Sequence, residues 1–250
     1  MPTITFADLS GHGVRLVGAT SSTFSQLLQQ RVDPEAISLL SPILPYAVIV
    51  SNDSSQAVTA LTVQYSVKNP AGKPITYRVT LSTLNRAREE MLLPGELALF
   101  VPQQKLCAKL RSGSKKMALN KATFNWPSQN LFDSQTEIQI SIDVAIFEDG
   151  SALGTDAGNT VARRNAHLAA GHDIATSVLA RSGADLKSYL SQLASVQKHP
   201  VDDPYGFEAE SLASRFYQEL IQSDEATLKS SVTRFLSLRA SIPATKRSIQ

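Results

Sequence analysis

The sequence is poor in the residues on which several protein classes depend. Its 250 residues include one cysteine, Cys107, which excludes an intramolecular disulfide framework and a cysteine-based zinc cluster. Aromatic residues make up 6%, and there are 12 glycines and 12 prolines, too few for a low-complexity or collagen-like chain. Because 24 Lys and Arg residues balance 22 Asp and Glu residues, the net charge of +2 does not favour a general nucleic-acid-binding protein.

Long apolar runs are also missing. No segment approaches the ~20 consecutive apolar residues of a membrane-spanning helix. The residues from Met1 to Asp8 show no basic region followed by an apolar stretch, so we expect no signal peptide in this chain. Two localisations fit this pattern: a cytoplasmic protein, or a mature exported form whose signal has been removed.

The first part of the chain has the period of antiparallel β-strands. Apolar and polar residues alternate over 61–67, 75–81 and 138–146, which places one face of each strand in a core and the other in water. Two shorter apolar stretches, 45–50 and 97–101, indicate further strands. Turn-forming residues separate these runs: 51–55, 69–74 and the pair Asp149-Gly150. We predict a β-sandwich over about 41–155, preceded by a strand and by short helical turns within 23–40.

From Asn159 onward the apolar residues recur with a helical period. One predicted helix covers 160–180, with Val161, Leu168, Ala175, Val178 and Leu179 on one side, and Gly183 separates it from a stripe running from Leu186 to Val196. A further helix spans 209–220, and Ser223 is predicted to cap the last one. The later helices share an apolar stripe that we expect to dock on the sandwich or on a partner: Leu212, Phe216, Leu220, Leu228, Val232 and Phe235. The predicted domains are thus 1–155 (N-terminal segment and sandwich) and 156–250 (helices, with a frayed tail).

Few residues are grouped as catalytic or metal sites require. His167 and His172 are five residues apart, out of phase for a shared helix face, so solvated histidines are favoured over a zinc site. The stretch 112–115 matches the Ser-x-x-Lys motif, but the Ser-Asp-Asn and Lys-Thr-Gly motifs that accompany it in such enzymes do not occur with it. Cys107 is interpreted as a packed small residue. Glu148, Asp149 and Asp156 offer oxygen ligands for Ca²⁺, but turn and cap roles explain them more simply. No glycine-rich phosphate loop occurs, so no nucleotide cofactor is predicted.

A basic stretch is the one strongly charged feature. No Asp or Glu occurs between Glu96 and Asp133, and aromatic residues such as Trp126 follow closely. Basic side chains interleaved with aromatic ones bind polyanions by charge and stacking. The candidate polyanion-binding residues are Lys105, Lys109, Arg111, Lys115, Lys116 and Lys121. Nucleic acid is nevertheless an unfavoured partner, and a solvated loop is the preferred interpretation.

The stretch Tyr46–Val58, continued through Val63 to Gly72, resembles an immunoglobulin-like or fibronectin III-like module, in which a strand ends in Asn and a polar turn. Phe147-Glu148-Asp149-Gly150, followed by Gly154 and by Arg163-Arg164, is similar to bacterial proteins that join such a sandwich to a helical C-terminal region. The resemblance implies an antiparallel immunoglobulin-like β-sandwich followed by helices, and it brings no functional residues. The cysteines that bridge the sheets of antibody domains are missing.

These observations favour a non-enzymatic structural or protein-interaction protein that binds another protein or a second copy of itself. The alternative is an enzyme or a ligand-binding protein. Its site would lie at the junction of sandwich and helices, near Asp149, Asp156, Arg163, Arg164 and His167, or on the basic stretch 105–121.

Overall fold

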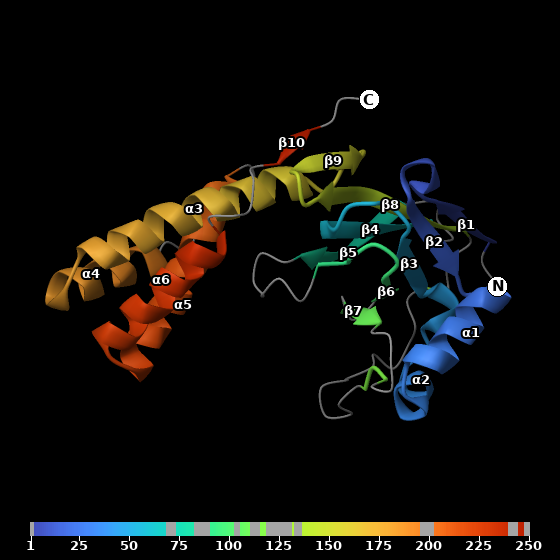
Figure 1. The fold of residues 1–250 in the computed structure, drawn as a ribbon, viewed down its shortest axis with the longest axis horizontal. Coiled ribbons are helices and arrows are strands. Elements are labelled where there is room, and N and C mark those ends of the chain that lie inside the picture. The colour runs from blue at the N-terminus through green and yellow to red at the C-terminus, as the bar shows by residue number, and fades with distance from the viewer. Residues whose placement is uncertain are drawn as a thin grey trace. The chain divides into compact units, whose positions relative to one another are not determined.

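The computed structural model describes residues 3–68, 74–82, 91–102, 106–110, 116–118, 132, 137–195, 203–239 and 245–247. The chain divides into two compact units (Figure 1): Met1–Glu148 with Ala152–Gly158, and Asp149–Ser151 with Asn159–Gln250. Strands dominate the first unit and helices the second, which confirms the predicted change from β to α structure. The main change of unit follows Gly158, three residues beyond the boundary predicted at 155.

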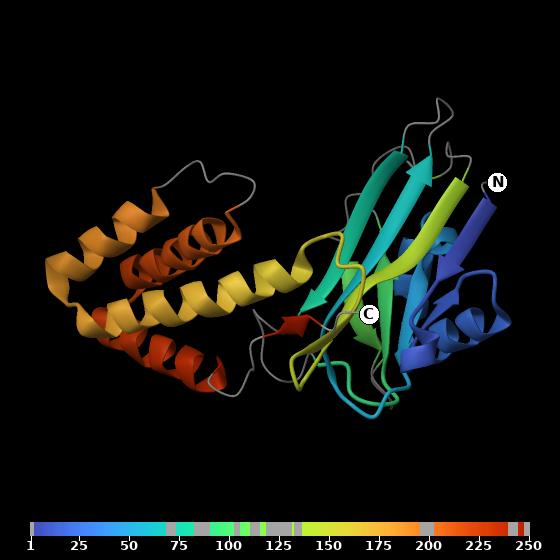
Figure 2. The same cartoon turned by 90° about the horizontal axis from the view of Figure 1, so that it is seen from above.

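One sheet of the first unit is centred on β4 (Val58–Lys68), which pairs antiparallel with β5 (Pro74–Ser82) and β8 (Glu137–Phe147). All three strands predicted from strict alternation therefore form, and Figure 2 shows them side by side. The far edge of β8 is shared by two short strands. β1 (Thr3–Ala7) pairs with 137–141 in parallel, and β9 (Ser151–Gly154) pairs with 144–146 antiparallel after the turn at Asp149-Gly150.

The other sheet has the antiparallel order β2 (Val14–Gly18), β3 (Val48–Asn52), β6 (Leu97–Val101) and β7 (Leu106–Leu110). The strand expected from residue 45 begins at Val48, because Leu44–Tyr46 forms a 3-10 turn that contains Pro45. Residues of both sheets form one apolar cluster, and the buried hydroxyl of Tyr65 in β4 donates to the carbonyl of Phe100 in β6 at 3.3 Å. The two sheets therefore face each other across a shared core.

Helices α1 (Ser22–Arg31) and α2 (Pro34–Leu40) confirm the helical turns expected within 23–40. Ser21 caps α1 by accepting from the amide of Thr23, and Asp33 caps α2 by accepting from that of Glu35. Their apolar faces belong to the sandwich core, with Phe24, Leu28, Ala36 and Leu40 all buried.

Asp143 is the clearest exception to the alternating pattern of the first unit. The alternation places it on the wet face of β8, but its side chain is 0% exposed. It is the additional residue of a β-bulge, because Thr62 pairs with Val144 while Val63 pairs with Ile142. Its carboxylate accepts hydrogen bonds from the Thr155 hydroxyl at 2.9 Å and from the amides of Ala157 and Gly158 at 2.8 and 2.9 Å. The guanidinium of Arg78 lies 3.7 Å from it.

The second unit consists of α3 (Thr160–Ala180), α4 (Gly183–Ala194), α5 (Pro204–Gln222), α6 (Glu225–Arg239) and the short strand β10 (Lys246–Arg247). The helices surround an apolar cluster of their own, which includes Ile174, Leu186, Phe216 and Leu228. The expectation that the stripe from Leu212 to Phe235 needs the sandwich or a partner is therefore wrong. The helices bury these side chains against one another.

The predicted cap of the last helix needs correction. Ser223 ends α5, where its hydroxyl donates to the carbonyl of Glu219, and Asp224 caps α6 by accepting from the amide of Thr227 at 2.7 Å. Asn159 occupies the N-cap position of α3 in a left-handed conformation, but its side chain makes no capping hydrogen bond.

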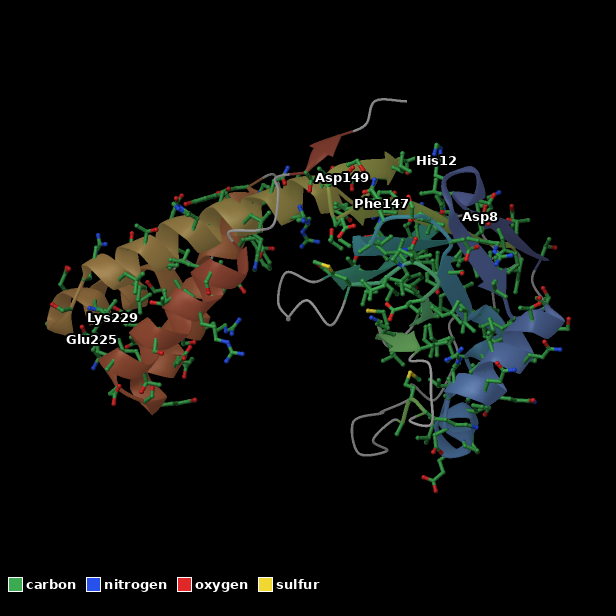
Figure 3. The ribbon with its side chains drawn as sticks, viewed as in Figure 1. Asp8, His12, Phe147, Asp149, Glu225 and Lys229 are labelled. Atoms are coloured by element: carbon green, nitrogen blue, oxygen red, sulfur yellow. The ribbon has the colours of Figure 1, made fainter. Side chains whose placement is uncertain are left out.

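Glu225 connects two helices of the second unit. Its carboxylate accepts from the amide of Gly183 at the start of α4, at 2.8 Å, and pairs with Lys229 one turn further along α6, at 2.9 Å (Figure 3). The hydrogen bond from Gly183, followed by that from Lys229, lowers the pKa of Glu225. The carboxylate thereby holds the beginnings of α4 and α6 together.

Candidate functional site

The first half of α3 buries polar side chains that the predicted apolar stripe does not include. Leu179, assigned to the apolar stripe, is 37% exposed, whereas Arg164 is 1% and His167 is 4% exposed. His172 lies in solvent as expected, with a side chain that is 73% exposed. The interpretation of both helix histidines as solvated is therefore wrong for His167. Arg164 and His167 follow Val161 at helical spacing, and they continue the buried face of α3 with polar groups.

His167 pairs with a glutamate on another helix. Its Nδ1 lies 2.5 Å from Oε2 of Glu208 on α5, and the two side chains are 6% and 18% exposed. A carboxylate at one ring nitrogen fixes the orientation and proton position of an imidazole. The same arrangement orients the general base in nucleophilic catalysis, where a nucleophile must also lie within reach of the other ring nitrogen. In this helical unit the pair joins α3 to α5 inside the protein.

Arg164 and Asn165 hold a segment from much later in the chain. The Arg164 Nη1 donates to the hydroxyl of Thr245 at 2.5 Å. The side-chain amide of Asn165 donates to the Thr245 carbonyl at 3.2 Å and accepts from its backbone amide at 2.9 Å. Thr245 is consequently buried, with 8% exposure. We call Arg164, Asn165 and Thr245 the threonine site.

Two exposed aromatic side chains at the start of α5 each contact a charged side chain of α3. Phe207 on α5 is 53% exposed, and the Arg163 guanidinium of α3 lies 5.9 Å from its ring centroid. Tyr205 is 41% exposed, and its hydroxyl donates to Asp173 of α3 at 2.7 Å. We call Arg163, Asp173, Tyr205 and Phe207 the α3–α5 surface. Each aromatic side chain on it is held by a charged side chain of α3.

The Tyr205 hydroxyl provides a direct test of this surface. The hydrogen bond to Asp173, followed by burial, raises the pKa of Tyr205 to about 12. Because the folded state holds the phenolic proton more tightly than the ordinary value of 10.0 implies, this interaction stabilises the fold below pH 10. The contribution is lost as the pH rises from there to about 12. In Asp173→Asn protein we expect the Tyr205 signal in a ¹³C-tyrosine NMR titration to move back toward 10.0. An unchanged titration in that variant would contradict the hydrogen bond.

The described members of the basic stretch are bound to other parts of the protein. The Lys109 amine lies 2.5 Å from the Glu96 carboxylate and donates to the carbonyl of Met91, and Lys116 donates to the carbonyl of Gln29. The other candidates, Lys105, Arg111, Lys115 and Lys121, lie outside the described residues, as do the Ser-x-x-Lys match and Trp126. Polyanion binding stays a prediction of the sequence.

That prediction can be measured directly. Since two of its amines already have protein acceptors, we expect the chain to bind heparin or single-stranded DNA only at background level at physiological salt. A genuine site would show affinity that falls steeply with salt. It would also disappear when Lys109, Arg111, Lys115 and Lys116 are replaced together by serine. Submicromolar, salt-sensitive binding in a filter or anisotropy assay would overturn our expectation.

Two of the carboxylates considered as Ca²⁺ ligands accept hydrogen bonds within the protein. Asp149 (Figure 3) accepts from both the amide and the hydroxyl of Ser151 in the turn after β8. The Glu148 carboxylate accepts from the Ala57 amide at 3.4 Å, and the Asp156 amide donates to the carbonyl of Asp143. Cys107 donates from its thiol to the carbonyl of Thr80. Among the described residues, no three His, Cys, Asp or Glu side chains come together as a metal site requires.

Within the described part of the chain, no helix combines the length and apolar character needed to span a membrane. Comparisons with models of protein families, with curated proteins and with solved structures found no match. The threonine site, the His167–Glu208 pair and the α3–α5 surface are therefore interpreted from their own chemistry.

Proposed function

We propose that the chain is a non-enzymatic protein-interaction protein built on an immunoglobulin-like sandwich. The strand order supports the fold assignment. β2-β3-β6 and β9-β8-β4-β5 correspond to the orders A-B-E and G-F-C-C′ of that fold. The fold also departs from the pattern, since β1 runs parallel to β8, α1 and α2 separate β2 from β3, and β7 follows β6 in the chain.

The α3–α5 surface is the observation that carries the proposed binding function. Large aromatic side chains left in solvent are a feature of recognition surfaces, and Tyr and Arg are enriched among the residues that contribute most to binding. Tyr205, Phe207 and Arg163 supply this combination on neighbouring helices. Since Asp173 and Arg163 already hold the two rings, a partner would order few side chains on binding. The partner is another protein or a second copy of the chain.

The His167–Glu208 pair is the observation closest to the alternative, an enzyme. A general base has to reach the proton that it removes from the substrate. The His167 side chain is only 6% exposed, so its burial supports a role in joining the helices. The interaction function therefore remains our proposal.

Site-specific crosslinking tests the proposal. A photoreactive phenylalanine analogue at position 207 should give one dominant protein adduct in cells, identified by mass spectrometry. The same analogue at Ile221, which is 55% exposed on the same helix, is the matched control and should not give this adduct. The identified protein, once purified, should bind Phe207→Ala at least about tenfold more weakly than the unmodified chain.

Identical adducts from positions 207 and 221 would overturn the proposal, as would unchanged affinity in Phe207→Ala. A folded control is available in the same experiment, because Ile221→Ala changes an equally exposed apolar side chain outside the α3–α5 surface.

A further inference from the structure

The threonine site binds Thr245 in the way that one strand binds its neighbour. The Asn165 side-chain amide both donates to the carbonyl of Thr245 and accepts from its amide, so it satisfies the two polar backbone groups of one residue. A peptide group on an adjacent β-strand offers the same donor and acceptor. This part of the recognition uses backbone groups alone and requires no particular side chain at the bound residue.

Arg164 adds selectivity for the side chain. Its Nη1 donates to the Thr245 hydroxyl, and the guanidinium is buried, with the residue 1% exposed. A buried donor of this kind disfavours a bound residue that offers no acceptor, because the polar group then loses a partner. The site is thus matched to a backbone whose amide and carbonyl are free to pair and whose residue carries a hydroxyl side chain.

We propose that the threonine site is a peptide-binding site that accepts the segment around Thr245 from a second copy of this chain as well as from its own. This inference rests on the proposed interaction function and names one partner for it. The observation that carries it is complementarity. Two neighbouring residues of α3 make these hydrogen bonds to Thr245, so an identical segment from another copy can make the same ones. Within one chain, the bound segment competes with the incoming one through its high effective concentration.

Peptide binding by the full-length chain tests the site. The probe is a fluorescent decapeptide with the sequence of residues 241–250, and the first variant is Thr245→Pro. Proline has neither the amide that Asn165 accepts from nor the hydroxyl that Arg164 contacts. This variant should release its own segment and bind the probe at least about tenfold more tightly than the unmodified chain does. Adding Asn165→Leu to the variant should abolish the gain, and a probe with Pro in place of Thr should not bind.

A mixing experiment tests the exchange between copies. Thr245→Pro chains keep an intact site but lack a competent segment, whereas Asn165→Leu chains keep the segment but lack the site. In sedimentation velocity, an equimolar mixture should form heterodimers, while each variant alone stays monomeric. Circular dichroism of each variant shows whether the helices remain folded.

Equal probe binding by all the chains, or a mixture that stays monomeric, would overturn the inference. Crosslinking from position 207 reports on the α3–α5 surface and does not require Asn165. A failure of the threonine site is therefore distinguishable from a failure of the proposed function.

Discussion

Asp143→Asn is expected to lower the free energy of unfolding of the first unit by about 3–5 kcal/mol, the usual cost of breaking a buried charged interaction. The carboxylate is fully buried and accepts hydrogen bonds from Thr155, Ala157 and Gly158. Asparagine keeps the shape, but its NH₂ group would face one of these donors, and Arg78 would lose its nearby charge. Denaturant-dependent hydrogen exchange, read by mass spectrometry on peptides from β4 and β8, measures the loss in this unit.

Thr155→Val is the matched control, because it removes only the hydroxyl donor at 2.9 Å. It should cost about 1 kcal/mol, the usual net contribution of one hydrogen bond. If Asp143→Asn were no more destabilising than Thr155→Val, the carboxylate would not be what holds residues 155–158 in place.

Phe216→Ala is expected to destabilise the helical unit by about 3–5 kcal/mol, the range for truncating a buried aromatic residue. Phe216 is 1% exposed, and its ring packs edge-on against Phe235 with 5.5 Å between centroids. Because the two buried apolar clusters share no residue, we expect the loss in α3–α6 peptides and unchanged protection in β4 and β8. Hydrogen exchange on both sets of peptides measures this in one experiment.

Phe207→Ala provides the comparison on the same helix. Its ring is 53% exposed, so we expect a change within about 0.5 kcal/mol. Equal loss of protection in the sandwich and in the helices of Phe216→Ala would show that the two clusters unfold as one cooperative unit, against our expectation.

The elements that could be predicted are those whose apolar residues recur with a regular period in the sequence. β4, β5 and β8 are long enough for alternation to be unambiguous, and the helical period predicts α3 at its observed bounds. Shorter strands are harder to predict: the single strand expected ahead of the N-terminal helical turns is two, β1 and β2, and the sequence predicts no strand at β7. Lys109 lies within β7, where its amine reaches Glu96, whereas the run of basic residues in the sequence favours a loop there.

The sequence names Arg164 and His167 for the alternative site, but it does not predict their burial, because they are polar residues on a buried face of α3. A period counted on apolar residues alone omits Arg164 and His167, although both follow Val161 at helical spacing. If the buried face is extended from Val161 by helical spacing alone, whatever the residue type, it includes both of them. Their partners had no such signal, because Glu208 and Thr245 are brought to α3 only by the packing of distant segments.

The two short strands along β8 also have a consequence for folding. β1 pairs with β8 in parallel, with Thr3 opposite Glu137, so this ladder closes across most of the length of the first unit. Contacts between residues so far apart in sequence form slowly, because a long loop must be closed before the contact contributes. β9, by contrast, follows β8 after a tight turn. We therefore expect the β8–β9 hairpin to form early and β1 to add late. Until it does, half of the β8 edge offers unpaired backbone groups to other chains.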